Sequence, residues 1–488
     1  MGKLKRNIKS LFSLTILFIL NLSYFTSSNF FLANNNYSSA NLAIPLELNP
    51  SINVVEEPSF VSSFSFSFDS INNLYLIYNE QQVNHNKLIY KEADSDYQWN
   101  LTEQIIVEDN NSLSIFGTPS IEVTADKLWF VIPYENSSSQ GVILYSKGLS
   151  SNKWHSNIIL SKEATSISSP LIQKIPEKDA LLFTWKDNHE GNFNIYTMYY
   201  NITTQLLNNL SRITSNSGFY ISNIKFTFDS NNDIHFVWSE GETNYEQILY
   251  RKIYQNGTME PIEFLTDGSN RCKYPTIIND GQGSINVFWT NYTKINPGID
   301  YGTININTVK KYSQGNWSKI LDIAPYIPLE RPPGSESDAE KPTVALDIDN
   351  NLWLAYEIRE QYVNHIGVDI RHRSNFGWQN GEKVSLVINS AIDPLIKADN
   401  AGNLHCMWLD IRYGSYDIIY RIKFITGLWS YEIALSHSST NAGSTLARNM
   451  GIIIAVIVAF SIPIFLLNRM KVRRLHKKMQ KKIDDLND

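Results

Sequence analysis

DPLIKADNAGNLHCMWLDIRYGSYDIIYRIKFITGLW, from Asp393 to Trp429, is the clearest copy of a phrase that the chain repeats seven times. Its segments LHCMW and DIIYRIK are short, alternating and rich in apolar residues, which predicts β-strands. The turn DNAGN before LHCMW contains residues that tolerate left-handed backbone, so it predicts a tight hairpin. The proline fits the first position of a strand, because it cannot donate to a ladder. Each phrase therefore predicts four short antiparallel strands.

Weaker copies of the phrase run back to Glu57. Their common register is an aromatic residue that closes the predicted second strand: Tyr78, Tyr134, Trp185, Trp238, Trp289, Tyr356 and Trp408. A period of about fifty residues with four strands per repeat is typical of a β-propeller blade. We predict an all-β, seven-bladed propeller over residues 57–437. Six or eight blades stay open, because two copies are incomplete and residues 41–56 form either a linker or a stray outer strand.

The N-terminal segment, residues 1–40, has a different composition. Four basic residues precede an apolar stretch from Leu11 to Leu22, and small polar residues follow it. This order is typical of a secretory signal. We predict a signal peptide, with an uncleaved signal anchor as the alternative.

A second apolar stretch lies near the C-terminus. The run from Gly451 to Leu467 has about the ~17 residues that can just cross a bilayer. Eight basic residues follow it in the segment 469–488, which predicts a cytoplasmic tail and a propeller outside the cell. We therefore predict a juxtamembrane linker at 438–449 and a single transmembrane helix at 450–468. The basic tail is explained by a stop-transfer signal, and contact with anionic lipid is the alternative.

Charge and cysteine content narrow the function classes. Without the four N-terminal basic residues, the eight basic residues of the tail and its three acids, 30 basic and 45 acidic residues remain. Such an acidic ectodomain is not expected to bind nucleic acid, which requires a basic footprint. Two cysteines, Cys272 and Cys406, are too few for a disulfide framework, and we predict that both are unpaired.

The repeat pattern over about residues 57–436 resembles the sialidase-like (BNR-type) extracellular propellers. The likeness rests on the proline, the Asp/Asn/Gly turn, and the second strand that ends in Trp, Asp, Arg and Gly before DIIY. The chain departs from the enzymes in lacking an Asp box: the nearest segments, SNFGW and SQGNW, have neither its Asp nor its Thr. The resemblance implies a propeller and, if the protein is an enzyme, a glycoside hydrolase of sialidase type. That chemistry needs an arginine cluster, a nucleophilic tyrosine with a carboxylate partner, and an acid or base.

Candidate site residues lie where two kinds of loop open on the same face of a propeller, namely the loops between second and third strands and those between blades. The arginines expected in these loops are Arg271, Arg331, Arg359 and Arg412. The carboxylates expected there are Asp187, Glu240, Glu357 and Asp410. An acidic residue follows the register aromatic in six of the seven repeats, so its favoured role is to hold its own loop by accepting backbone N–H bonds.

The fifth repeat is longer than the others, with a step of 67 residues to the next aromatic. We predict two long loops there, Asn291–Gly302 and Ala324–Pro342. Long insertions on a rigid scaffold often carry function. The ligand-contacting candidates in them are Tyr292, Tyr301, Tyr326, Arg331 and Glu336.

No cofactor is expected, although calcium is an alternative. Asp347, Asp349 and Asn351 alternate, and Asp229 and Asp233 flank another turn. A calcium loop needs more oxygen ligands and a closing bidentate carboxylate, so hairpin-turn chemistry is the simpler explanation.

Three functions fit this sequence. The preferred one is a cell-surface propeller for recognition or adhesion, which binds a carbohydrate or protein ligand. The first alternative is a sialidase-like surface glycoside hydrolase. The second is a receptor that couples ligand binding outside to a partner on the tail. Fold alone does not decide between them.

Overall fold

The computed structural model describes residues 59–436, except for 83–85, 101–102, 109–113, 137–138, 209, 216–217, 297–298, 325–336, 361–364, 375–376 and 387–390. The predicted signal segment, stray strand, membrane helix and tail lie outside these residues. Within them, the structure contains no helix with the length and apolarity that a membrane span requires.

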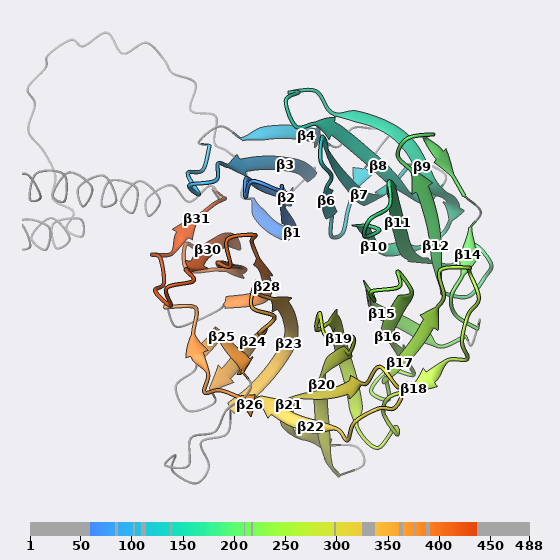
Figure 1. Cartoon of the computed structure of the whole chain (residues 1–488), viewed down its shortest axis with the longest axis vertical. Coiled ribbons are helices and arrows are strands. Elements are labelled where there is room, and N and C mark those ends of the chain that lie inside the picture. Colours follow the sequence, from blue (N-terminus) through green and yellow to red (C-terminus); the bar gives the residue numbers. More distant parts are fainter. Residues whose placement is uncertain are drawn as a thin grey trace, which may run out of the picture. The chain divides into compact units, whose positions relative to one another are not determined.

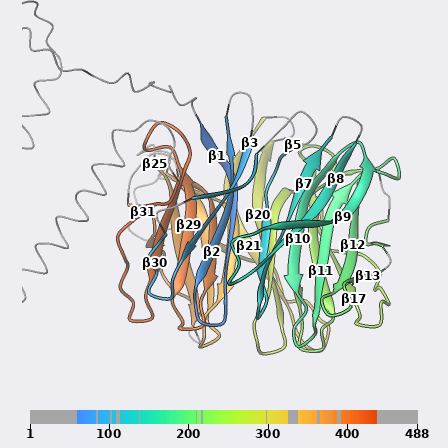
Figure 2. The ribbon, with the colours of Figure 1, turned by 90° about the horizontal axis from the view of Figure 1, so that it is seen from above.

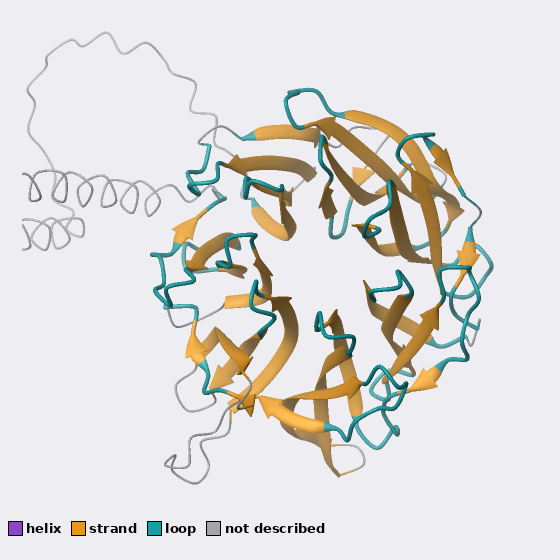
Figure 3. Ribbon diagram, viewed as in Figure 1, coloured by secondary structure: helices purple, strands orange, loops and turns teal. Residues whose placement is uncertain are grey.

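Seven antiparallel sheets form a ring, which confirms the seven-bladed propeller (Figure 1 and Figure 3). Blade 1 contains β1 (Phe60–Phe68), β2 (Leu74–Gln81), β3 (Asn86–Ala93) and β4 (Gln104–Glu108). Blade 2 contains β5 (Ser114–Ile115), β6 (Ser120–Val123), β7 (Lys127–Glu135), β8 (Gln140–Gly148) and β9 (His155–Ala164). Blade 3 contains β10 (Ile167–Lys174), β11 (Ala180–Asp187), β12 (Asn194–Asn201), β13 (Leu206–Leu207) and β14 (Ser211–Arg212).

The remaining four blades repeat this order. Blade 4 contains β15 (Tyr220–Phe228), β16 (Ile234–Gly241), β17 (Gln247–Ile253) and β18 (Glu263–Phe264). Blade 5 contains β19 (Arg271–Asn279), β20 (Ile285–Asn296), β21 (Ile299–Lys311) and β22 (Leu321–Ala324). Blade 6 contains β23 (Ser337–Leu346), β24 (Leu352–Glu360), β25 (His365–Ser374), β26 (Gly377–Trp378) and β27 (Glu382–Lys383). Blade 7 contains β28 (Ala391–Ala398), β29 (Leu404–Asp410), β30 (Asp417–Lys423) and β31 (Ile433–Ala434).

The first strand of each blade lies innermost, and the strands run between the two faces of the ring (Figure 1 and Figure 2). One face carries the loops between second and third strands and is called the loop face below. The other carries the hairpins between first and second strands and is called the hairpin face. The first strand pairs antiparallel with the second, so its N-terminal end lies toward the loop face.

The core consists of seven clusters of buried side chains, and each cluster joins one blade to the next. The cluster between blades 7 and 1 includes Tyr78 and Tyr420, and the Lys91 ammonium donates to the Leu435 carbonyl across the same seam at 2.6 Å. In the described part of the chain, every sheet is built from strands consecutive in sequence. Among these residues, side-chain packing and a backbone hydrogen bond from the Val61 N–H to the Tyr416 carbonyl, at 2.9 Å, join blade 1 to blade 7.

In blade 2, Ile132 takes the place that the repeat gives to the aromatic residue, and Tyr134 lies two residues further along β7, where Glu240 lies in blade 4. In the other six blades, the register aromatics are buried at equivalent places in the second strands, as predicted. They do not close those strands, however. For example, β11 continues two residues beyond Trp185, to Asp187, and β29 two residues beyond Trp408, to Asp410. The cause is that the acidic residues expected in the loops are themselves paired in the ladders.

Two further expectations are corrected. Pro170, Pro275, Pro342 and Pro394 lie inside the first strands, where the pairing with the second strand slips, and not at the strand starts. A bulge accepts a proline because its residues leave the ladder. In blade 5, the predicted loop Asn291–Gly302 is mostly strand, since β20 and β21 are extended into a long hairpin. Cys272 and Cys406 are buried and unpaired, as predicted.

Candidate binding site

A ring of strained residues lies on the innermost strands of blades 3 to 7. Ser169, Asn223, Tyr274, Lys341 and Asp393 have positive φ values, between 50° and 55°. Each sits where the pairing of first and second strands slips. Non-glycine residues rarely adopt this conformation, and bulges often redirect side chains beside functional sites. These residues lie toward the loop face. We call this end of the innermost strands, together with the charged side chains beside it, the inner rim.

Three consecutive rim residues, from blades 5, 6 and 7, are joined through Lys341. Its ammonium lies 2.9 Å from Glu357 Oε1, 2.7 Å from Asp393 Oδ1 and 5.9 Å from the centre of the Tyr274 ring. The backbone of the rim is fixed as well, because the Asp393 N–H donates to Glu357 at 2.8 Å and the Lys341 N–H donates to Thr290 Oγ1 at 3.0 Å. Burial alone would lower the pKa of Lys341, but the two carboxylates hold that pKa above its usual range.

A second chain of contacts continues along the rim from blade 4 to blade 6. Arg271 Nε lies 2.8 Å from Glu246 Oε2, and its guanidinium covers the Tyr292 ring at 5.3 Å. The Tyr292 hydroxyl donates to Glu340 Oε2 at 3.0 Å, and Arg359 Nη1 lies 3.9 Å from Glu340 Oε1. The structure thus links Arg271, Tyr292 and Arg359 in one chain of contacts, in which Tyr292 and Arg359 contact Glu340 while Arg271 pairs with Glu246 and covers the Tyr292 ring. It places all three on strands, whereas the sequence predicted loops.

The two chains share an arrangement in which buried carboxylates hold more exposed cations. The carboxylate side chains are 4% exposed at Glu246, 9% at Glu340 and 0% at Glu357. The cations are 18% exposed at Arg271, 18% at Lys273, 25% at Lys341 and 47% at Arg359. Asp393, at 47%, is the exposed exception among the carboxylates. The rim therefore offers cationic groups whose positions are fixed from beneath.

Burial raises the pKa of the Tyr292 hydroxyl, and the charge of Glu340 raises it further. A tyrosine that acts as a nucleophile needs the opposite shift, because its reactive form is the phenolate. At neutral pH, Tyr292 is a hydrogen-bond donor that positions Glu340.

Three of the predicted acidic residues serve the core. Asp187 and Asp410 end the second strands of their blades, and Glu240 is the last residue but one of its strand. Each accepts the indole N–H of the tryptophan two residues earlier, at 2.7 Å for Asp187, 2.7 Å for Glu240 and 3.3 Å for Asp410. Asp410 also accepts the backbone N–H of Arg412 at 2.9 Å. Their place in strands corrects the predicted place in loops, while the bonds to backbone agree with the structural role that the sequence favoured.

The other predicted residues are not part of this cluster of contacts. Arg412 lies in the turn after β29 and is ion-paired with Asp410 and Glu432. Tyr301 belongs to β21, but the position of its side chain is not among the described features. Tyr326, Arg331 and Glu336 lie outside the described residues. The predicted loop Ala324–Pro342 in fact ends in strand, since β23 begins at Ser337.

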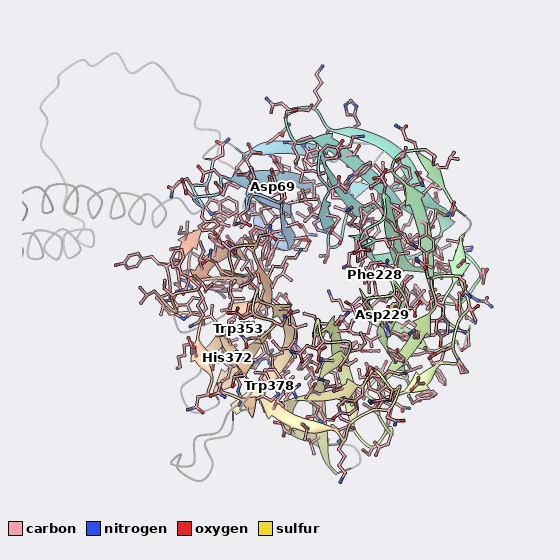
Figure 4. All side chains as sticks on the ribbon, in the orientation of Figure 1. Asp69, Phe228, Asp229, Trp353, His372 and Trp378 are labelled. Carbon is pink, nitrogen blue, oxygen red and sulfur yellow. The ribbon has the colours of Figure 1, made fainter. Side chains whose placement is uncertain are left out.

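The aspartates that suggested calcium cap the hairpin turns. Asp347 Oδ1 accepts the N–H groups of Asp349 and Asn351, and its Oδ2 accepts the Trp353 indole N–H at 2.8 Å. Asp229 does the same in blade 4, with His235 as the ring partner at 3.1 Å. Figure 4 labels this residue together with Asp69, its equivalent in blade 1. In the part of the chain that the structure describes, no group of His, Cys, Asp and Glu is placed to hold a metal ion.

Comparisons with known proteins found distant structural likenesses alone. No protein-family model matches the chain, and no curated protein matches it in sequence. One similar structure is an alpha-L-arabinanase of Penicillium chrysogenum complexed with arabinobiose (11% identity, TM-score 0.43, covering 64% of this chain and 92% of that one). Another is the β-propeller domain of the Trilobed protease of Pyrococcus furiosus, described as an open velcro topology (9%, 0.45, 78% and 96%). A third is an alpha-L-arabinofuranosidase of Fusarium graminearum (10%, 0.43, 75% and 93%). At these values the likeness carries no argument about function.

The sequence reasoning missed Lys341, Asp393, Tyr274, Glu340 and Glu246. Three of them had a usable signal, since Tyr274, Lys341 and Asp393 directly precede the prolines of their repeats. A residue before proline is barred from the ordinary helical conformation, and a bulge there aims its side chain at the rim. Glu340 and Glu246 had no such signal, because their partners are 19 or more residues away in sequence.

Proposed function

We propose that the protein is a membrane-anchored cell-surface propeller that recognises a ligand bearing carboxylate groups, carbohydrate or protein, at the inner rim of blades 4 to 7. The observation that carries the proposal is the set of lysine and arginine side chains that reach solvent in part while buried carboxylates hold them in place. Lys273 and Arg359 contribute hydrogen-bond donors that a carboxylate can accept, and Arg271 adds positive charge beside them. Support for the anchor and the location comes from the sequence alone, through the apolar segment and the basic tail.

Preorganisation favours binding at such a rim. A flexible lysine or arginine loses side-chain entropy when it binds a ligand, by about 0.5–1.5 kcal/mol for each immobilised side chain. Here Glu246 and Glu340 already restrict the cations, so less of that loss remains for the ligand to offset. In an ectodomain with an excess of acidic residues, a local cationic rim also attracts an acidic partner selectively.

The second candidate is a sialidase-like glycoside hydrolase. It is favoured by the hydrogen bond between Tyr292 and Glu340, with Arg271 and Arg359 beside them. Two observations weigh against it. Tyr292 is buried with a raised pKa, and Arg271 is engaged by Glu246 through both Nε and Nη2. A receptor role has no specific support in the described residues.

The experiment that separates these functions uses the purified full-length protein with sialosides and uronic acid glycosides. Retention of the intact glycan and release of free sugar are measured in the same samples. We expect retention without release, and we expect retention to weaken in the Arg359→Gln variant but not in the Lys319→Gln variant, whose lysine is exposed on the outer part of blade 5. Sugar release that disappears in Tyr292→Phe would instead establish the hydrolase.

A further inference from the structure

The innermost strands carry an unusual set of charges below the rim. Beyond the bulges, toward the hairpin face, the described first strands contain four charged residues: Glu122 of β6, Lys174 of β10, Lys225 of β15 and Lys397 of β28. The other residues in these half-strands are apolar or uncharged. The strands that carry these residues, β6, β10, β15 and β28, lie around the centre of the ring (Figure 1).

Their strands place these groups on the inner surface of the ring. Lys225 is exposed, although its strand is flanked by the first strands of both neighbouring blades. A side chain flanked on both sides can meet water only at the centre. The Lys397 ammonium lies 5.6 Å from the Phe66 ring, on the neighbouring innermost strand of blade 1.

The cross-strand register gives their heights. Lys397 pairs with His405, three residues before the register aromatic of its blade, and Lys174 pairs with Leu181, four residues before. Glu122 pairs with Trp129, three residues before Ile132, which takes the aromatic's place in blade 2, whereas Lys225 pairs with Val237, one residue before the aromatic. With about 3.3 Å per residue in a strand, the four backbone positions span roughly 10 Å along the axis. Lysine side chains can converge over that span.

The lysines lack an acidic partner of their own. In the described part of the chain, none of the three forms an ion pair, in contrast to the rim lysines Lys273 and Lys341. Charges enclosed by protein are normally paired, because water no longer solvates them fully. Lys225 and Lys397 repel each other, while Glu122 attracts Lys397 and Lys174. One carboxylate does not balance three ammonium groups.

We propose that the centre of the ring binds a small divalent oxyanion, such as sulfate or phosphate, between Lys174, Lys225 and Lys397. The site is separate from the inner rim, and it stands or falls independently of the proposed recognition function. Glu122 tunes it, because burial raises the pKa of this carboxyl to about 7. As the pH falls from 8 to 6, Glu122 takes up a proton and its repulsion of the anion is lost. Desolvation by the surrounding protein lowers the pKa values of Lys225 and Lys397 from the ordinary lysine range, which lies above this pH interval.

The test is calorimetric titration of the full-length protein with sodium sulfate, whose charge is constant between pH 6 and 8. Sodium chloride at matched ionic strength is the control titrant. We expect saturable sulfate binding that is tighter at pH 6 than at pH 8. Lys225→Gln and Lys397→Gln should each weaken it by about tenfold or more, equivalent to about 1.4 kcal/mol. Lys319→Gln should leave it unchanged, and Glu122→Gln should remove the pH dependence.

A folding control accompanies these variants. Removing one of three repelling charges should leave the melting temperature in chloride buffer equal to or above that of the wild type, so lost binding is not lost folding. Absence of saturable sulfate binding, or equal binding by the Lys225 and Lys397 variants, would overturn the site. Binding of glucose 6-sulfate in place of inorganic sulfate would identify a sulfate ester as the occupant and overturn the free ion.

Discussion

Replacement of Lys341 by methionine tests how the rim is held. The Lys341 ammonium lies between the buried carboxylate of Glu357 and the exposed carboxylate of Asp393. Methionine keeps most of the length of the lysine side chain but not its charge. Breaking a buried ion pair typically destabilises a protein by about 3–5 kcal/mol, because one charge is left without compensation. Lys341 is one quarter exposed, so solvent moderates the loss, and we expect about 2–4 kcal/mol. For roughly 380 folded residues at about 2.1 cal/mol/K each, this lowers the melting temperature by about 3–5 °C.

The assay is thermal unfolding of the full-length protein at pH 7, with Lys319→Met as the control for loss of an exposed lysine. The second arm is the double variant Lys341→Met/Glu357→Gln. The double variant removes the Glu357 charge that Lys341→Met leaves without a partner, while the amide oxygen of the new glutamine can still accept the Asp393 N–H. We therefore expect at least half of the lost stability to return. A shift below about 1 °C in the single variant, or a double variant less stable than the single one, would refute the reasoning.

Three further predictions concern the core, pH and topology. Trp185→Ala, Trp238→Ala and Trp408→Ala should each lower the free energy of unfolding by about 3–5 kcal/mol in denaturant titrations, because each deletes a fully buried aromatic; losses below about 1 kcal/mol would contradict their shared place in the core. Burial lowers the pKa of His405, so in acid the unfolded chain binds a proton that the folded chain does not, and stability falls as the pH drops below about 6.5. The difference in melting temperature between pH 7 and pH 5 should therefore shrink in His405→Gln, and an unchanged difference would refute this assignment. Protease added to intact cells should remove the propeller and spare a fragment with Lys477 and Lys478, and protection of the propeller would contradict the topology.

The fold could be predicted because its signals are local and repeated. The second strand, its aromatic residue and the Asp turn recur in most blades, so an error in one copy is corrected by the others. Strand ends were less predictable. Asp187 and Asp410 read as loop residues because carboxylates are usually exposed, but the nearby indole N–H groups give them buried partners.

The candidate site was predictable only in part. Arg271, Tyr292, Glu357 and Arg359 were chosen from the sequence, and the structure places them on the same rim. The residues that join them come from other blades, as Glu246 does for Arg271 and Glu340 for Tyr292. Such pairings depend on how blades sit beside one another, which the repeat period does not specify. Arg412 was chosen on the same grounds, but its partners Asp410 and Glu432 belong to its own blade.

Recognition of a carboxylate at the rim is tested most directly by one equilibrium measurement. The full-length protein is titrated with an acidic glycan that it retains and with the methyl ester of the same glycan. The measured quantity is the ratio of the affinity for the free acid to the affinity for the ester. The rim cations predict a ratio of about tenfold or more in favour of the free carboxylate, equivalent to about 1.4 kcal/mol. The ratio should fall toward one in Arg359→Gln and stay unchanged in Lys319→Gln. Equal affinity of the wild type for acid and ester would contradict the account.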